Sequence, residues 1–251
     1  MDLELTGKRA LVTGGSRGIG KAIARELLRE GADVAIAARD QARIDATVAE
    51  LAREPGRRVV GTSADTGDGG SVAAMVKASA DALGGIDILV NAAARPGGQQ
   101  PAPRWDAVTE EALFEEIRVK VLGYLRVAQA AAPYMIAGGW GRIINVSGLA
   151  ARQTGSVIGS VRNVSVAAMS KNLADELAPH GINVVTVHPG ITRTEATSEE
   201  AAQRPAANLA GRMIDAREVA YVVTFLASPK SAAVDGDAIA AGGGVPGSIY
   251  Y

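Results

Sequence analysis

The feature that most constrains the fold is a glycine-rich turn close to the start of the chain. It spans residues 13–20 with the sequence TGGSRGIG, follows a short apolar run at residues 9–13 and leads into a segment of helical period. Glycines let a backbone turn sharply and approach a phosphate closely, and the N-terminus of a following helix favours negative charge. A strand before the turn and a helix after it are the context that this mechanism requires. The turn therefore predicts a site for the pyrophosphate of a dinucleotide.

Short runs rich in Val and Ile alternate with longer segments of helical period along the whole chain. This alternation is typical of a parallel sheet with helices on both faces. The predicted strands lie at residues 9–13, 33–38, 58–63, 86–91, 142–147, 183–188 and 237–241. The predicted helices lie at residues 18–30, 40–53, 71–83, 109–135 and 163–178, and Gly31 and Gly181 follow two of them where helix-ending glycines are common. No repeat or long linker divides residues 1–251, so we expect a single α/β domain, a doubly wound Rossmann fold of about seven strands.

Composition excludes several classes of function. The 26 basic and 27 acidic side chains nearly cancel, which disfavours nucleic-acid binding. Cys is absent and the only histidines are His180 and His188, which excludes disulfides, thiolate nucleophiles and the usual zinc sites. We see neither a signal peptide nor an apolar run approaching the roughly 20 residues of a membrane span. We expect a soluble cytoplasmic protein without a metal, in which redox chemistry would need an organic cofactor.

Three loops at residues 95–103, 148–162 and 192–208 follow predicted strand ends. In an open doubly wound sheet the ligand binds beyond the carboxyl ends of the strands, so these loops are expected to form the walls of the site. Residues 197–208 are either a mobile lid or an ordinary solvated surface segment.

The spacing Thr-Gly-x-x-x-Gly-x-Gly resembles that of the short-chain dehydrogenase/reductase family, and further segments match in order over essentially the whole chain. Asp65 stands where the family places an acid beside the adenine, and residues 91–94 (NAAA) resemble its Asn-Asn-Ala-Gly element. Residues 189–194 (PGITRT) are similar to the segment that embraces the nicotinamide half, and residues 218–228 and 237–239 to the last helix and strand. The resemblance implies an oxidoreductase that binds a nicotinamide dinucleotide and acts on a small alcohol or carbonyl compound.

The residues expected to bind the cofactor come from the glycine turn, from strand ends and from one helix. They are Gly14, Ser16, Arg17, Gly18, Ile19, Gly20, Arg39, Asp65, Asn91, Lys171, Pro189, Gly190, Ile191 and Thr194.

The end of the second strand favours NADP(H), with NAD(H) as the alternative. An NAD enzyme usually carries a carboxylate there for the adenine ribose, but this chain has Ala38, followed by Arg39. Arg39 and Arg17 could hold a 2′-phosphate through charge-assisted hydrogen bonds. The alternative leaves both arginines in solvent and lets Asp40 bind the ribose.

The residues at the expected reaction centre differ from the family's catalytic residues. The family donates a proton from a tyrosine four residues before a lysine, whose charge favours the phenolate. The resemblance aligns that lysine with Lys171, expected to contact the nicotinamide ribose, and places Ala167 at the tyrosine position. The family's serine aligns with Gly148, its asparagine aligns with Lys120, and a small shift of the alignment would give the serine role to Ser147. The interval from Gly148 to Ala167 looks about six residues longer than usual, so we expect its loop to follow a different path.

Three groups are candidates to compensate for the missing tyrosine. Asn163 shares a helical face with Lys171 and could orient a substrate, but it cannot act as an acid. Lys120 and Lys171, if both point into the cleft, would repel and push one amine toward neutrality, although Lys120 could equally be a solvated helix residue. Tyr250 or Tyr251 of the C-terminal tail could be supplied by another subunit.

Three functions stay open at this stage. The first is an NADP(H)-dependent oxidoreductase with an altered proton-transfer apparatus, in which Lys120, Ser147, Asn163 and Lys171 are the candidate catalytic residues. The second is a catalytically silent dinucleotide-binding sensor or partner subunit, and the third is a lyase, hydratase or isomerase on the same scaffold. For each we expect a small-molecule ligand, no nucleic-acid or membrane partner, and a homo-oligomer, either dimer or tetramer.

Overall fold

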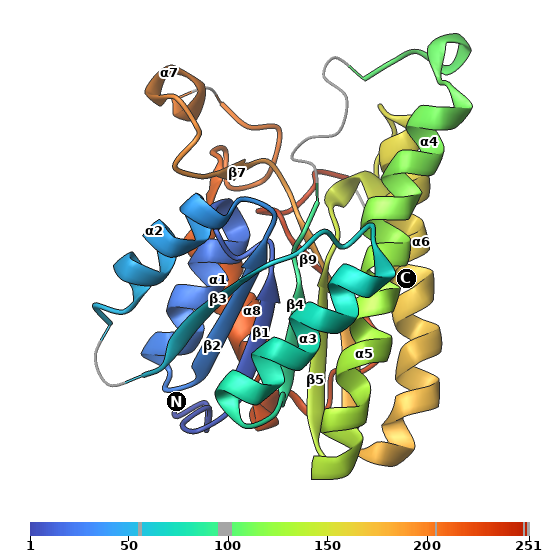
Figure 1. Cartoon of the computed structure of the whole chain (residues 1–251). Helices are drawn as coiled ribbons and strands as arrows, with labels where there is room; N and C mark the ends of the chain where they lie inside the picture. The colour runs from blue at the N-terminus through green and yellow to red at the C-terminus, as the bar shows by residue number, and fades with distance from the viewer. Residues whose placement is uncertain (55–56, 95–101, 204, 248, 250–251) are drawn as a thin grey trace.

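A parallel sheet of seven strands forms the centre of the protein (Figure 1). The computed structural model describes residues 1–54, 57–94, 102–203, 205–247 and 249. The strands of this sheet, in spatial order, are β3 (Val59–Ser63), β2 (Asp33–Ala38), β1 (Arg9–Thr13), β4 (Ile88–Asn91), β5 (Gly141–Val146), β6 (Ile182–Pro189) and β9 (Ala238–Ala241). A second sheet pairs β7 (Thr192–Arg193) with β8 (Ile214–Asp215). The order changes direction between β1 and β4, where an open α/β sheet binds its ligand.

Helices cover both faces of the sheet. The helices are α1 (Gly18–Arg29), α2 (Gln41–Leu51), α3 (Gly69–Leu83), α4 (Glu110–Glu116), α5 (Leu122–Gly138), α6 (Val157–Leu177), α7 (Glu199–Ala202) and α8 (Ala216–Leu226), of which the short α7 lies beyond the strand ends rather than on a face. One π-helical segment, η2 (Ile117–Val121), joins α4 to α5. Short 3₁₀ turns are η1 (Trp105–Ala107), η3 (Leu149–Ala151), η4 (Ala178–His180) and η5 (Pro229–Ser231).

The hydrophobic core has two layers, one on each face of the sheet. Side chains of α1, α2 and α8, such as Leu27 and Val223, pack on one face, and side chains of α3, α5 and α6, such as Met75 and Val127, pack on the other. The inner strands β1, β2, β4, β5 and β6 are rich in apolar residues because both of their faces are buried, whereas the edge strands β3 and β9 are only partly buried. This architecture confirms the predicted doubly wound Rossmann fold.

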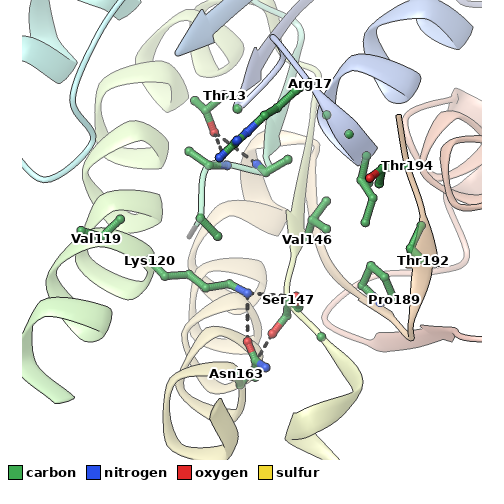
Figure 2. Close-up of a pocket in the computed structure, with 18 of the residues that line it drawn as sticks. Thr13, Arg17, Val119, Lys120, Val146, Ser147, Asn163, Pro189, Thr192 and Thr194 are labelled. Atoms are coloured by element: carbon green, nitrogen blue, oxygen red, sulfur yellow. Dashed lines mark hydrogen bonds between the residues drawn. The ribbon is translucent and has the colours of Figure 1, made fainter. Parts of the chain in front are cut away.

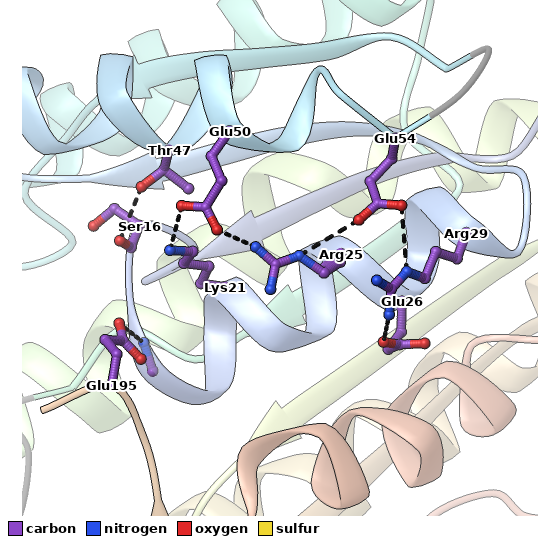
Figure 3. A network of polar contacts seen from close by, with 10 residues as sticks. Ser16, Lys21, Arg25, Glu26, Arg29, Thr47, Glu50, Glu54 and Glu195 are labelled. Carbon is purple, nitrogen blue, oxygen red and sulfur yellow. Dashed lines mark hydrogen bonds and ion pairs between the residues drawn. The ribbon is translucent and has the colours of Figure 1, made fainter. Parts of the chain in front are cut away.

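Ion pairs fasten α2 to α1, the helix that follows the glycine turn (Figure 3), and a further ion pair fastens α8 to α1. Glu50 of α2 accepts hydrogen bonds from Lys21 and Arg25 of α1. On the other side of α1, Glu26 is 6% exposed and pairs with Arg217 of α8 at 3.0 Å. These contacts hold the helix whose first turn faces the ligand cleft.

The fourth and fifth predicted helices differ from their predicted forms. The predicted helix 109–135 contains the π-helical segment η2, whose wider turn carries Lys120 inward, to 3% exposure. Helix α6 begins at Val157 rather than at residue 163, because the Ser156 hydroxyl accepts a hydrogen bond from the Gly159 amide and caps the helix. The predicted loop 148–162 therefore ends at Ser156, and the expectation of an unusually long loop is wrong.

Two negative findings apply to the part of the chain that the structure describes. No helix there is long and apolar enough to span a membrane. No group of three or more His, Asp or Glu side chains there is arranged to hold a metal ion.

Candidate active site

A cleft of about 1220 Å³ lies at the carboxyl ends of the central strands. Twelve of the residues predicted to bind the cofactor line it: Gly14, Ser16, Arg17, Gly18, Ile19, Gly20, Arg39, Asp65, Pro189, Gly190, Ile191 and Thr194. The residues around α7 form one wall, because Ala196 and Asn208 also line the cleft. Residues 95–101 of the predicted loop 95–103 and the tail tyrosines Tyr250 and Tyr251 lie outside the described residues, so their expected roles stay predictions.

The glycine turn forms one end of the cleft. A Cβ atom on Gly14 would lie 2.6 Å from the Ala92 carbonyl oxygen, and one on Gly20 would lie 2.3 Å from the Gly14 oxygen. The N-cap residue of α1, Arg17, makes no side-chain cap, and the Gly18 amide instead donates to the Glu195 carboxylate at 2.7 Å (Figure 3). An anionic oxygen is therefore already held by the first turn of α1, which is the contact that a cofactor phosphate needs.

Three arginines lie at the neighbouring part of the cleft, beyond the end of β2. Arg17 and Arg39 line the cleft as predicted, and Arg43 of α2 joins them. The alternative ligand Asp40 also lines the cleft, and its Oδ1 caps α2 by accepting from the Arg43 amide at 3.1 Å. Arg43 was missed because the sequence does not show that the first turn of α2 borders the cleft. Asp65 lines the cleft while its Oδ1 accepts from the Gly67 amide at 2.8 Å.

Asn91 does not line the cleft with its side chain, contrary to the prediction. It is 0% exposed, and its amide nitrogen donates to the Asn145 side chain at 3.0 Å and to the Tyr124 carbonyl at 3.3 Å. The resemblance found the segment correctly, because the residues that follow Asn91 do line the cleft. Asn91 itself joins β4 to β5 and α5.

Lys120, Ser147 and Asn163 meet at the other end of the cleft (Figure 2). The Lys120 Nζ donates to the Ser147 carbonyl oxygen and to the Asn163 Oδ1, both at 2.9 Å. The Ser147 hydroxyl donates to the Asn163 carbonyl oxygen at 3.1 Å. A Cβ on Gly148 would lie 3.0 Å from the Asn163 amide nitrogen, so a larger residue there would press on this cluster. Three of the four predicted catalytic residues are thus brought together.

Lys120 has an unusual electrostatic environment. Burial, followed by the positive charge of Arg162, lowers the pKa of Lys120 to about 7, against an opposing effect of Glu116. Arg162 of α6 lines the cleft and forms a buried ion pair with Glu116 at the end of α4. The Arg162 Nε is buried without a hydrogen-bond partner among the residues that the structure describes. No sequence signal identifies this pair, because 46 residues separate its members.

Lys171 does not lie in the cleft, and its predicted roles are wrong for this structure. Its side chain is 58% exposed and pairs with Asp175 of the same helix at 2.5 Å. Lys171 follows Asn163 by eight residues on α6, which is about 12 Å along a helix, and it lies near Gly236, before the start of β9. The expected repulsion between Lys120 and Lys171 therefore does not occur. Ala167, four residues before Lys171, is likewise absent from the cleft lining.

Two other titratable groups lie close behind the cleft. The Tyr124 hydroxyl is fully buried and donates to the Val146 carbonyl at 2.9 Å, and burial raises the pKa of this phenol. His188 belongs to β6, as predicted, and its Nδ1 accepts from the Gly148 amide at 3.4 Å. Burial, with Arg152 and Lys120 nearby, lowers the pKa of His188 to about 4, so the ring is neutral at pH 7. Neither group lines the cleft.

The glycine turn, the switch of strand order and the cleft beyond the strand ends define a dinucleotide-binding protein of the Rossmann class. The comparisons identify the family. Residues 8–205 match the model of the short chain dehydrogenases. The chain is 34% identical over 257 residues to the 3-oxoacyl-(acyl-carrier-protein) reductase FabG of Vibrio cholerae serotype O1, with 97% of this chain and 99% of that protein covered. It belongs to the short-chain dehydrogenase/reductase family of oxidoreductases.

Two solved structures agree with this assignment. A short chain dehydrogenase from Burkholderia cenocepacia J2315 in complex with NADP is similar with a TM-score of 0.85 and 34% identity, covering 96% of this chain and 98% of that one. The L-sorbose reductase from Gluconobacter frateurii, complexed with NADPH and L-sorbose, is similar with a TM-score of 0.92 and 27% identity, covering 99% and 100%.

Proposed function

We propose that this protein is an NADP(H)-dependent oxidoreductase that interconverts a small carbonyl compound and its alcohol. The observation that carries the cofactor preference is the group of Arg17, Arg39 and Arg43 at the ribose part of the cleft, where Asp40 is already a helix cap. Three cations suit the extra phosphate of NADP(H), and they outnumber the one nearby carboxylate, Asp40, that could accept from the ribose hydroxyls of NAD(H). The relative named as a 3-oxoacyl-(acyl-carrier-protein) reductase supports carbonyl reduction, and the two cofactor complexes support NADP(H).

The cleft fits a nicotinamide dinucleotide along its whole length. The amides at the start of α1 would hold the pyrophosphate, and one of them, the Gly18 amide, already binds the Glu195 carboxylate. Asp65 would lie beside the adenine, and residues 189–194 would lie along the nicotinamide half. The bound cofactor supplies or accepts the hydride, and the side chains at the far end of the cleft position the substrate.

The active site that we propose lacks the family's tyrosine. The α6 residue that is hydrogen-bonded to Ser147 and Lys120 is Asn163, and the residue four positions earlier is Gly159. We therefore place the family's tyrosine and lysine positions at Gly159 and Asn163 rather than at Ala167 and Lys171. A lysine is nevertheless present, because Lys120 of η2 enters the same cluster from the opposite side.

A catalytically silent binding protein is the second candidate, since Gly159 offers no acid. The ionisable Lys120 in the cleft favours turnover instead, because a silent site gains nothing from burying an amine. Binding of NADPH and NADH, followed by cofactor fluorescence, and oxidation of NADPH with a panel of small keto compounds and keto esters separate the two. Tight binding without turnover would support the silent protein, and absence of binding would refute the proposed function altogether.

The cofactor preference has its own test in Arg39→Ala. Losing a hydrogen bond to a charged group costs about 1.5 kcal/mol of binding free energy, which corresponds to a factor of about ten in Kd. We therefore expect the Kd for NADPH to rise about tenfold, with the Kd for NADH nearly unchanged. Arg53→Ala removes an exposed arginine that does not line the cleft and serves as the control. Equal losses for both cofactors would contradict a 2′-phosphate contact.

A further inference from the structure

Reduction of a carbonyl group needs an acid at the reaction end of the cleft, because the carbonyl oxygen becomes negative as the carbon is reduced. Among the cleft-lining residues that the structure describes, the ionisable groups beside Ser147 are Lys120 and Arg162. Arg162 does not release a proton at any working pH. The nearby phenol of Tyr124 is directed to the Val146 carbonyl and lies outside the cleft. Lys120 is therefore the group at this place that can exchange a proton.

The hydrogen bonds of Lys120 accommodate both of its protonation states. An ammonium group has three N–H donors, and the structure uses two of them, on the Ser147 carbonyl oxygen and the Asn163 Oδ1. No third acceptor is found among the described residues, and because Lys120 lines the cleft the third donor is available to a ligand. A neutral amine keeps both bonds with its two N–H groups and presents a lone pair in the third position. Loss of the proton therefore leaves neither acceptor unpaired, which a buried catalytic acid requires.

The charges around Lys120 make that exchange accessible near neutral pH. The groups that face it are Arg162 from α6, Glu116 from α4 and the neutral His188 from β6. Burial and Arg162 together bring the pKa of Lys120 down to about 7, where an acid is most effective at working pH. With Lys120 protonated, two cations face one carboxylate, and the excess positive charge favours a developing oxyanion.

We propose that Lys120 is the catalytic acid of this enzyme and takes the place of the family's tyrosine. This inference rests on the proposed function. As hydride with its two electrons adds to the carbonyl carbon, the C=O π pair moves to oxygen, the Lys120 N–H bond breaks and an O–H bond forms. The products are the alcohol, the oxidised cofactor and a neutral Lys120, which regains its proton from water. Alcohol oxidation runs the same steps in reverse, with the neutral amine as base.

Lys120→Met tests the proposal, because methionine fills the space without an ionisable group. General acid catalysis contributes about 10²–10⁴-fold, and we expect kcat/KM for reduction to fall within that range while the Kd for NADPH stays nearly constant. In the wild type, kcat/KM for reduction should fall as pH rises through about 7, and kcat/KM for alcohol oxidation should rise through the same pH. Lys77→Met, an exposed lysine on α3, is the matched control and should leave rates and pH profiles unchanged.

Two further measurements separate proton transfer from a structural role. Lys120→Ala should regain part of its turnover when ethylamine or methylamine is added, whereas Lys77→Met should not respond. The lysine Nζ of the wild type can be titrated by NMR after ¹⁵N labelling, with Lys120→Arg used for assignment. A Lys120 Nζ that titrates near pH 7 supports the proposal, and one that titrates above pH 9 overturns it whatever the activity.

The failures of the two proposals are distinguishable. A wild type that does not bind either nicotinamide cofactor would refute the proposed function, and the role of Lys120 would fall with it. An active wild type whose Lys120→Met variant keeps kcat/KM within about threefold, with the same pH profile, would refute only the role of Lys120.

Discussion

The two ends of the cleft are built from different parts of the polypeptide. The cofactor end is made by backbone amides, and it works because Gly14 and Gly20 carry no side chains. The reaction end is made by side chains from three separate segments, with Lys120, Asn163 and the Glu116–Arg162 pair packed in the interior. The cofactor end depends on the absence of side chains at two glycines, and the reaction end depends on buried charges that balance one another.

This difference teaches how each end tolerates change. At the glycine turn an added carbon meets main-chain atoms that cannot move aside, so the site keeps a local sequence pattern. At the reaction end a changed residue can be compensated by another residue far away in the chain. Lys120 and Asn163 are an example of such compensation. The positive charge is carried by Lys120 of η2, and the oxygen that accepts its hydrogen bond belongs to Asn163 of α6.

The largest expected effect comes from breaking the buried ion pair. Removing one partner of a buried pair costs about 3–5 kcal/mol, so Glu116→Gln and Arg162→Met should both lower the free energy of unfolding by about that amount. Their effects on Lys120 should have opposite signs. Glu116 raises the pKa of Lys120 and Arg162 lowers it, so Glu116→Gln should move the pH profile of reduction below 7 and Arg162→Met should move it above 7.

Urea unfolding and pH–rate profiles measure these two consequences. Asp81→Asn, which removes an exposed partner of Lys77, is the control and should change stability by less than about 0.5 kcal/mol. Shifts of the pH profile in the same direction for Glu116→Gln and Arg162→Met would show that Lys120 does not set it.

The second largest expected effect is on cofactor binding at the glycine turn. Gly20→Ala places a carbon 2.3 Å from the Gly14 carbonyl oxygen, and such overpacking costs about 1–3 kcal/mol. We expect the Kd for NADPH to rise about 10- to 100-fold, because 1.4 kcal/mol corresponds to a factor of ten. Gly69→Ala on α3 is the matched control, since an added Cβ there meets nothing within 4 Å. Cofactor titration should leave Gly69→Ala unchanged, and equal behaviour of the two variants would show that the turn does not approach the ligand.

The same contrast decides how much the sequence could predict. The alternation of apolar runs and helical segments predicted all seven strands of the central sheet and their parallel arrangement within a few residues. The glycine turn predicted the cofactor end, because a local pattern of missing side chains is visible in the sequence. Arg43 escaped prediction, since its place beside Arg39 depends on how α2 packs.

The reaction end could be predicted only in part. Lys120, Ser147 and Asn163 were identified, but the sequence suggested Lys171 as the partner of Lys120 because its surroundings resemble those of a family lysine. The true surroundings depend on where α6 begins, and the Ser156 cap sets that start six residues earlier than predicted. The Glu116–Arg162 pair joins residues from two distant segments, and no local sequence pattern predicts it.

The smallest expected effect is that of Lys171→Met, which distinguishes the exposed Lys171 from the buried Lys120. Lys171 forms an exposed pair with Asp175, which raises the pKa of Lys171, and solvent screens pairs of this kind so that they add little to stability. Lys171→Met should therefore leave the free energy of unfolding nearly unchanged and keep the Kd for NADPH and kcat/KM within about twofold. Cofactor titration and steady-state rates measure both quantities. A large loss of cofactor binding in Lys171→Met would mean that Lys171, rather than Asn163, is the α6 residue that contacts the cofactor. The contrast between the cofactor end, built from backbone amides, and the reaction end, built from compensating side chains, would then no longer hold.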